Sequence, residues 1–264
     1  MSVTATGAAL GGARGLPGAA GAIMSGLRGD AAVENPDGRQ FVKYNFFKLD
    51  PAWRRLPESE RTDNKREFAA VVEESASHML IRSYSMVGLR GDVDFLLWQA
   101  TDTLESLQDM ATSLWRTGLG GYLSQPYSYL AMTHRSQYVG GHKHAEQEGT
   151  SVRVKPGQAD YFVVYPFLKT REWYLLPDSE RQRMMNDHFR IGHKYPSVKI
   201  NTTYSFGLDD QEFIVAFETN SPSDFLDLVM ELRGVEGSLY TLKDTPIFTA
   251  IHRSIDDTLD SLGG

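Results

Sequence analysis

An internal repeat constrains the fold of this chain more than any other feature of its sequence. Three segments recur in the same order at a spacing of about 120 residues, which is the signature of a duplicated unit. The matching pairs are residues 41–48 with 162–169, Trp53 with Trp173, and 56–61 with 176–181. This order predicts two similar halves, residues 41–133 and 158–255, joined by a polar, glycine-rich linker loop at 134–157.

Each half is predicted to follow the order strand, helix, two strands, helix, strand. In the second half we expect strands at 161–168, 198–208, 211–218 and 246–251, and helices at 176–195 and from Ser221 or Ser223 onward. This order is the ferredoxin-like motif, whose sheet leaves one face in need of a partner. The repeat supplies that partner. We therefore expect an α+β fold, a duplicated ferredoxin-like unit with antiparallel sheets forming a barrel and helices outside.

Composition narrows the class of protein without naming a function. The 264 residues are 41% hydrophobic and 23% charged, as in ordinary globular proteins, and the net charge of -7 argues against a general nucleic-acid surface. Without cysteine, any metal must be held by histidine, carboxylate, tyrosine or methionine. No apolar run reaches the roughly 18 residues that a membrane span needs, and we expect a cytoplasmic protein. Residues 1–40 are interpreted as a flexible Gly/Ala-rich tail, with a cleaved targeting segment as the alternative.

Differences between the two halves are candidates for function, because a residue needed only for folding should occur in both. His188 corresponds to Phe68 in the helix predicted after Trp173. A histidine on an apolar helix face is either a hydrogen-bonded structural residue or a metal ligand. The apolar counterpart in the first half leaves these two interpretations evenly matched.

Tyr165 and Lys169 form a second pair of candidates on and just past the strand predicted at 161–168. Alternation along a strand puts both on one face, from which a phenol and an ammonium group can enter a pocket. In the repeat alignment they match Tyr44 and Lys48, and this match favours a structural role for both.

Two linker histidines, His142 and His144, have two interpretations as well. They belong either to a solvated loop or to a metal pair or acid–base site. Other common motifs are missing from the sequence: it has no P-loop, no glycine-rich dinucleotide motif after a strand, no His-Glu-x-x-His helix and no Gly-x-Ser-x-Gly elbow.

The motifs of the second half, in their order, resemble the chlorite dismutase superfamily. They are YPFLK at 165–169, REWYLLP at 171–177, Met184-Met185 with His188, YPSVK at 195–199 and YSFGLDD at 204–210. The resemblance extends over residues 41–253. Members of this superfamily are duplicated ferredoxin-like barrels that bind haem in the C-terminal half. The resemblance therefore implies that His188 is the proximal ligand of a haem iron.

The resemblance also distinguishes two branches of the superfamily. Chlorite-degrading members carry a distal arginine directly after a Val-Lys pair, and in this chain that pair is followed by Ile200. An apolar side chain cannot hold an oxyanion over iron, so chlorite chemistry is disfavoured. The coproheme decarboxylase branch is similar in its strand tyrosine, in the lysine four residues later and in the tryptophan eight residues later, here Tyr165, Lys169 and Trp173.

Membership of that branch implies a reaction on the porphyrin itself. Hydrogen peroxide drives the oxidative decarboxylation of two propionates of iron coproporphyrin III to vinyl groups, which gives haem b. The implied catalytic residues are Tyr165 as a radical relay, Lys169 as a clamp on a propionate, and Trp173. The implied porphyrin-binding residues are His188, Tyr165, Lys169, Met185, Ile200 and Arg153, where Arg153 or Lys155 is a weaker electrostatic candidate than Lys169.

Further expectations concern the distal base, the partners and the alternative functions. A distal histidine serves as a base for peroxide in actinobacterial-type members, and His142 or His144 lies in the equivalent region, although neither keeps the spacing to Tyr165. The protein is expected to be a homo-oligomeric ring, commonly a pentamer, with no nucleic-acid partner. Two other functions stay open: a chlorite-degrading or general haem peroxidase, if another cation reaches the iron, and a non-enzymatic haem-binding module, which His188 would serve equally.

Overall fold

The computed structural model describes residues 37–138 and 152–263 of the chain. The predicted tail lies outside the described residues except for residues 37–40, and His142 and His144 lie outside them too. The mechanistic expectations for these two histidines therefore stay predictions.

The elements of the first half appear in the predicted order. They are β1 (Phe41–Leu49), α1 (Glu58–Ser75), β2 (Leu80–Ser85), β3 (Phe95–Thr101), α2 (Leu104–Arg116) and β4 (Leu123–Met132). The second half consists of β5 (Tyr161–Lys169), α3 (Arg171–Leu175), α4 (Asp178–Gly192), β6 (Val198–Tyr204), β7 (Phe213–Thr219), α5 (Pro222–Arg233), β8 (Thr241–Lys243), β9 (Phe248–Arg253) and α6 (Ile255–Asp260). Of these, α3, β8 and α6 were not expected from the sequence pattern.

The first long helix of each half begins in the same way because the local sequence is the same. Pro57 precedes α1 and Pro177 precedes α4, each with a φ of -53°. Proline fixes φ near the helical range, and the acidic residues in the first turn of each helix interact favourably with the helix dipole.

Two local features of the second half differ from the prediction. Strand β6 ends at Tyr204 rather than at residue 208, because Gly207 adopts a φ of +71° in a turn that the amide of Leu208 closes on the carbonyl of Ser205. Ser221 does precede α5, but its hydroxyl lies 3.1 Å from that of Ser223 and caps no helix amide.

All strand pairs are antiparallel, and their pairings run in a closed circuit. The order is β7-β6-β4-β1-β3-β2-β9-β5-β8, and β5 pairs with β7 as well. Within the circuit, the first half has the order β4-β1-β3-β2 and the second has β9-β5-β7-β6, so equivalent strands follow the same order in both halves. The halves are hydrogen-bonded to each other where β2 meets β9 and where β4 meets β6.

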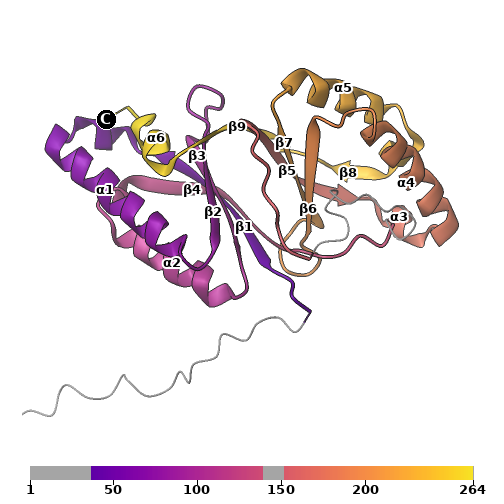
Figure 1. The fold of residues 1–264 in the computed structure, drawn as a ribbon, viewed down its shortest axis with the longest axis horizontal. Coiled ribbons are helices and arrows are strands. Elements are labelled where there is room, and N and C mark those ends of the chain that lie inside the picture. The colour runs from indigo at the N-terminus through magenta and orange to yellow at the C-terminus, as the bar shows by residue number, and fades with distance from the viewer. Residues whose placement is uncertain (1–36, 139–151, 264) are drawn as a thin grey trace, which may run out of the picture. The chain divides into compact units, whose positions relative to one another are not determined.

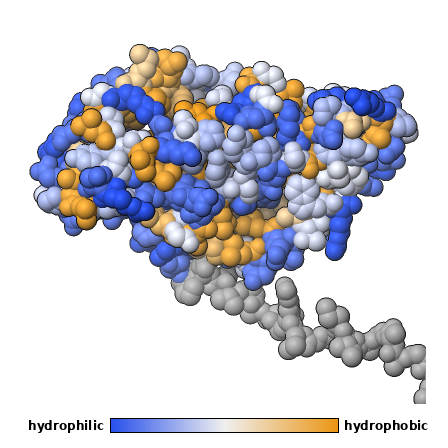
Figure 2. Space-filling view, turned by 180° about the vertical axis from the view of Figure 1, so that it is seen from behind, coloured by the Kyte–Doolittle hydropathy of each residue, from blue (hydrophilic) through white to orange (hydrophobic). Residues whose placement is uncertain are grey.

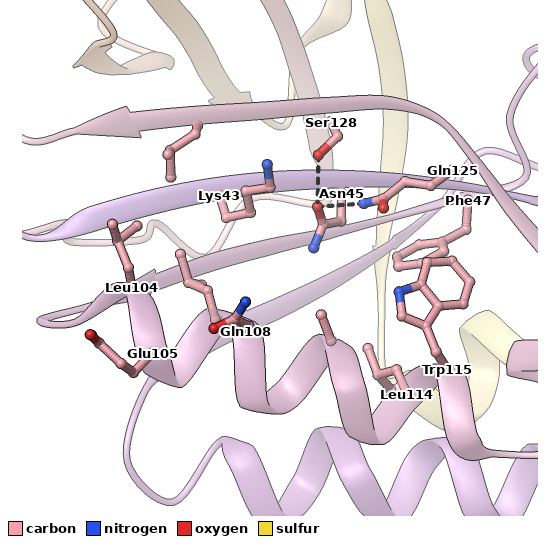
Figure 3. A pocket seen from close by; sticks show the side chains of 13 residues that line it. Lys43, Asn45, Phe47, Leu104, Glu105, Gln108, Leu114, Trp115, Gln125 and Ser128 are labelled. Carbon is pink, nitrogen blue, oxygen red and sulfur yellow. Dashed lines mark hydrogen bonds between the residues drawn. The ribbon is translucent and has the colours of Figure 1, made fainter. Parts of the chain in front are cut away.

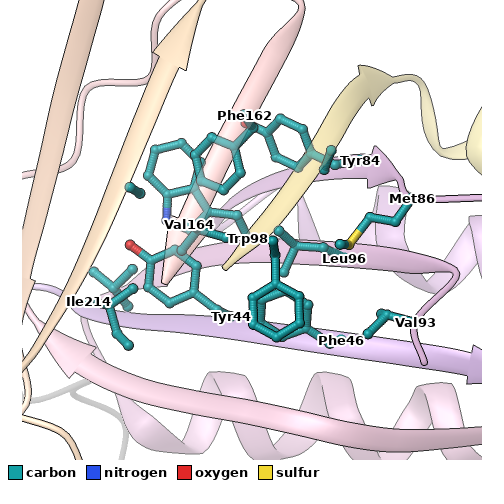
Figure 4. Close-up of a cluster of buried hydrophobic side chains, with 14 of the residues drawn as sticks. Tyr44, Phe46, Tyr84, Met86, Val93, Leu96, Trp98, Phe162, Val164 and Ile214 are labelled. Atoms are coloured by element: carbon teal, nitrogen blue, oxygen red, sulfur yellow. The ribbon is translucent and has the colours of Figure 1, made fainter. Parts of the chain in front are cut away.

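One face of the paired strands from both halves forms a shared apolar interior (Figure 4). The Trp98 ring of β3 stacks on Tyr44 of β1, with centroids 6.2 Å apart, and on Phe162 of β5, with centroids 5.1 Å apart. All three side chains are fully buried. Because this interior takes residues from both halves, it ties them into one folded unit.

The opposite face of the strands carries the helices. Figure 1 shows α1, α2 and α6 beside the strands of the first half, and α4 and α5 beside those of the second. Each half therefore has a layer of side chains between its strands and its helices, and these two layers are packed differently.

The structure corrects the repeat alignment of the strands by one residue. Strands β1 and β5 are both nine residues long and start 120 positions apart, as do α1 and α4. With this offset Tyr165 corresponds to Asn45 rather than to Tyr44, and Lys169 corresponds to Leu49 rather than to Lys48. Tyr44 points into the shared interior, whereas Tyr165 packs on the helix side, as expected when a one-residue shift reverses the faces of a strand.

Candidate haem site between the second-half strands and helix α4

The candidate site lies in the layer between the second-half strands and helices α4 and α5, here called the C-terminal layer. It has five buried apolar residues, Val163, Ile191, Val198, Phe217 and Leu228, and seven partly buried ones, Tyr165, Tyr195, Ile200, Val215, Phe225, Leu232 and Val235. Most of its apolar side chains therefore keep surface that no described residue covers. Such a layer suits a large apolar ligand inserted between helix and sheet.

In the matching layer of the first half, the N-terminal layer, aromatic packing fills the position that corresponds to His188. Phe68, which aligns with His188, is fully buried, with its ring centroid 6.2 Å from that of Phe47 and 5.9 Å from that of Phe95. Phe47 and Phe95 stack in turn at 4.8 Å. The same position of the repeat thus fills a core in one half and presents an imidazole in the other.

His188 projects from the eleventh position of α4 and is partly buried. Burial first, and then the positive charge of Lys169, lowers the pKa of His188 to about 4. The imidazole is therefore neutral at pH 7, the form that binds a metal. Within residues 37–138 and 152–263 no hydrogen bond engages the imidazole, so none of these residues supplies an acceptor that would orient the ring.

Lys169 lies at the end of β5, where its ammonium Nζ donates a hydrogen bond of 2.8 Å to the carbonyl of Gly237. The same ammonium lies 4.3 Å from the ring centroid of Trp173, a cation–π contact. Desolvation by burial lowers the pKa of Lys169 to about 8. The structure therefore brings Lys169, Trp173 and His188 together, and two of the three ammonium hydrogens are left for other acceptors.

Trp173 is almost completely buried in α3. Its ring lies 5.6 Å from that of Tyr240 and 6.5 Å from that of Tyr138, measured between centroids. Trp53 of the first half is equally buried at the aligned position, so this tryptophan has a packing role in both halves. Its catalytic role stays a prediction.

Tyr165 is partly buried in the middle of β5, with its ring 5.8 Å from that of Phe217. Burial, followed by the negative charge of Asp244, raises the pKa of Tyr165, whereas the charge of Arg233 opposes this shift. The phenol therefore keeps its hydroxyl hydrogen at neutral pH. In the described ranges, 37–138 and 152–263, no side chain or backbone group hydrogen-bonds to this hydroxyl, so the hydrogen is not committed to an internal acceptor.

Ile200 and Met185, which were predicted to contact the porphyrin, lie on different elements of the site. Ile200 lies on β6 opposite Phe217 of β7 and packs on the C-terminal layer, as an apolar lining residue should. Met185 follows the buried Met184 on α4 and is partly exposed. Their contacts with a porphyrin stay predictions.

Arg153 is bound by a residue of the first half rather than by the residues around His188. Its guanidinium forms two hydrogen bonds, of 3.0 and 3.2 Å, with the carboxylate of Asp102, which directly follows β3 of the first half. An electrostatic role toward the porphyrin would have to compete with this ion pair, and that role stays a prediction.

Glu212, which organises one end of the site, was not predicted from the sequence. This carboxylate is 8% exposed and accepts hydrogen bonds from the backbone amide of Lys169 at 2.8 Å and from the hydroxyl of Tyr174 at 2.6 Å. It thereby fixes the end of β5, from which the Lys169 side chain extends, relative to α3. A carboxylate just before a strand has no distinctive spacing, so only the folded contacts identify it.

The residues present fit an iron porphyrin better than a metal held by protein alone. Among the described residues, no three histidine, aspartate or glutamate side chains gather into a metal site. A metal at His188 would then need its other ligands from the molecule that brings it, as a porphyrin supplies four nitrogens. The neutral imidazole and the loosely covered apolar layer suit the iron and the flat ring of such a group.

Comparisons with known proteins support this assignment. Residues 61–253 match the family model described as chlorite dismutase. A coproheme decarboxylase of Mycolicibacterium smegmatis is 34% identical over 225 residues, which cover 84% of this chain and 94% of that protein. A coproheme decarboxylase of Staphylococcus carnosus is 30% identical over 221 residues, covering 76% of this chain and 86% of that protein.

Solved structures show the same fold. The chlorite dismutase of Candidatus Nitrospira defluvii in complex with imidazole superposes with a TM-score of 0.77 at 26% identity, covering 85% of this chain and 95% of that one. A haem-binding protein of Thermus thermophilus has a TM-score of 0.74 at 25% identity, covering 84% and 94%. No helix in the described part of the chain combines the length and apolar character needed to cross a membrane. The family model and the two relatives show that this chain belongs to the chlorite dismutase family.

Proposed function

We propose that the protein is a coproheme decarboxylase that converts iron coproporphyrin III to haem b with hydrogen peroxide. The observation that carries this proposal is the position of Lys169 near His188, with Tyr165 in the apolar layer beside them. The first half has Leu49, Phe68 and Asn45 at the aligned positions. The two relatives named coproheme decarboxylase support it over most of their length.

The overall chemistry requires two electrons to leave each reacting propionate. One propionate loses its carboxylate as carbon dioxide and one hydrogen from the carbon next to the ring, so that a vinyl group forms. One hydrogen peroxide takes up the two electrons and, with protons, becomes two water molecules. When bound, the iron porphyrin supplies the redox centre for this exchange and is at the same time the substrate.

The residues of the chain have separate tasks in this proposal. His188 offers a neutral imidazole because burial and Lys169 keep its pKa low. Lys169 keeps two ammonium hydrogens for a propionate carboxylate, and Glu212 holds the strand end from which Lys169 extends. The hydroxyl of Tyr165 is protonated and has no hydrogen-bond partner among the described residues, so it can give up its hydrogen and then take one from a propionate carbon.

Ile200 supports decarboxylation over chlorite degradation. Its side chain packs among the apolar residues of the C-terminal layer and offers no charge to an oxyanion. A general haem peroxidase and a non-enzymatic haem carrier are the competing functions, and the experiment below separates both from the proposal.

The proposal also covers the barrel fold and the assembly of the chain into an oligomer. We propose that the closed circuit of strand pairs is the duplicated ferredoxin-like barrel of the family, with halves at 41–133 and 158–255.

The five most exposed large apolar residues of the described chain all lie in the second half: Leu175, Leu226, Met230, Leu239 and Leu242. Figure 2 shows apolar residues exposed among charged ones on one face of the molecule. Such exposure supports a homo-oligomer, for which the family suggests a pentameric ring in the cytoplasm.

The test is to load the purified protein with iron coproporphyrin III, add hydrogen peroxide stepwise and follow the porphyrin by mass spectrometry. We expect the loss of two carboxyl groups as carbon dioxide, through a one-vinyl intermediate. A bound porphyrin of unchanged mass would identify a carrier, and one that is only bleached would identify a general peroxidase.

Tyr165→Phe keeps the ring contact with Phe217 and removes only the hydroxyl, so it should abolish decarboxylation and preserve porphyrin binding. Tyr161→Phe is the matched control, since it lies on the same strand about 13 Å away and should remain active. Normal product formation by Tyr165→Phe would exclude Tyr165 from the mechanism.

A further inference from the structure

We propose that the first half of the protein holds a second ligand site, which binds a medium-chain fatty carboxylate between α2 and strands β1 and β4. The structure has a cavity of about 490 Å³ at this place (Figure 3). Its size lies in the range of roughly 300 to 1,000 Å³ that is usual for small-molecule sites. Its lining residues belong to the first half alone, so the site is separate from that around His188.

One wall of the cavity is polar and is held in place by hydrogen bonds. The carboxamide oxygen of Asn45 accepts hydrogen bonds from Gln125 at 2.6 Å and from Ser128 at 3.4 Å, and the Asn45 amide donates to Gln99 at 2.9 Å. Figure 3 shows Asn45, Gln125 and Ser128 joined in this way above α2. Such a network fixes the wall before any ligand arrives.

Lys43 provides the charge in this wall. It lines the cavity and is partly buried, and within residues 37–138 and 152–263 no hydrogen bond or salt bridge engages its ammonium. Desolvation by burial lowers the pKa of Lys43, although the carboxylate of Asp209 opposes the shift. That carboxylate already accepts hydrogen bonds from the backbone amides of Leu130 and Asp210. A ligand carboxylate would therefore meet an ammonium that donates to no acceptor in the described part of the chain.

The other wall is apolar and elongated. Helix α2 contributes Leu104, Leu107, Ala111, Leu114 and Trp115 to the lining. From Leu104 to Trp115 the helix rises about 16 Å, so the cavity favours a long, narrow molecule. Leu104 and Trp115 are 44% and 42% exposed, which leaves apolar surface at both ends for an alkyl chain.

The two walls together orient the ligand. Figure 3 shows Lys43 toward the end at which α2 begins and Trp115 near the other end. The start of a helix carries a partial positive charge, which adds to that of Lys43. Glu105, also in the lining, is exposed at the rim, where water screens its negative charge. The carboxylate therefore lies at Lys43 and the alkyl chain runs along α2 toward Trp115.

Decanoate is the probe for this site. Its affinity should be measured by isothermal titration calorimetry on the full chain, first loaded with iron porphyrin so that the layer beside His188 is filled, and then without porphyrin. We expect one decanoate per chain in both states. Lys43→Met should weaken binding by about tenfold or more, since it removes a charge-assisted hydrogen bond. Lys65→Met, which removes an ammonium paired with Asp260 on α6, is the matched control and should bind as the parent does.

A second variant keeps the test independent of the charge. Ala111→Phe adds a ring that fills empty space beside α2, so it should abolish decanoate binding while circular dichroism and the Soret band stay unchanged. The proposal is wrong if the parent chain does not bind decanoate, or if either Lys43→Met or Ala111→Phe binds it with parental affinity. It is also wrong if Trp115→Arg changes the molar mass in light scattering and decanoate does not bind, since the cavity would then be a contact between subunits.

Discussion

The N-terminal and C-terminal layers are built from the same secondary structure but are packed differently around the position of His188. In the N-terminal layer Phe68 interlocks with Phe47 and Phe95 and leaves no surface exposed. In the C-terminal layer the aligned position holds His188, and most neighbouring apolar side chains remain partly uncovered. The difference teaches that one position of a repeat can fill a core in one half and leave a side chain available to a ligand in the other.

The largest effect that would sharpen this comparison is on stability. Phe68→Ala should lower the free energy of unfolding by about 4 kcal/mol, because it leaves a cavity among the tightly packed rings of Phe47 and Phe95. Phe225→Ala, at a partly buried position of the C-terminal layer, should cost only about 1 kcal/mol. Urea unfolding of the porphyrin-free protein measures both. Equal losses would show that the two layers are packed equally well.

A smaller effect is expected when the second layer is made like the first. His188→Phe removes the imidazole and inserts the residue found at position 68, so porphyrin affinity should fall by roughly hundredfold, or about 2.7 kcal/mol. Titration of the Soret band measures the change. His193→Phe, a substitution of an exposed histidine at the end of the same helix, should bind as the parent does. Parental spectra for His188→Phe would refute its role as a ligand.

The smallest effect is a dependence of stability on pH. The pKa of His188 is about 4 in the folded protein and about 6.5 in an unfolded chain, so the unfolded state binds more protons between these values. The porphyrin-free protein should therefore lose on the order of 2 kcal/mol of stability as the pH falls from 6.5 toward 4. Comparison with His188→Phe isolates this contribution from that of the carboxylates. If both proteins lose stability in parallel, the imidazole is not desolvated.

The elements and their order could be predicted from the sequence because each depends on local signals. Pro177 and its acidic neighbours mark the start of α4, and the repeat transfers the same pattern to α1. His188 could be identified as a candidate because the repeat aligns it with the apolar Phe68.

The pairing of Tyr165 with Tyr44 was wrong for a physical reason. Matching letters align these strands with an offset of 121, but the strands and helices themselves are offset by 120, and one residue reverses the face of a strand. Contacts that depend on the fold were also out of reach, such as Lys169 with the carbonyl of Gly237 and Arg153 with Asp102. These partners are distant in sequence, and only the closed arrangement of strands brings them together.

That closed circuit also has a consequence for how the chain can be divided. A fragment ending before β5 would leave the outer sides of β2 and β4 without partners and would uncover Tyr44 and Trp98 to water. Unpaired strand edges beside an apolar face promote aggregation. Each half therefore depends on the other to pair its outer strands and to cover its apolar face. We expect expression of either half alone to give insoluble material, and co-expression of the other half to restore solubility.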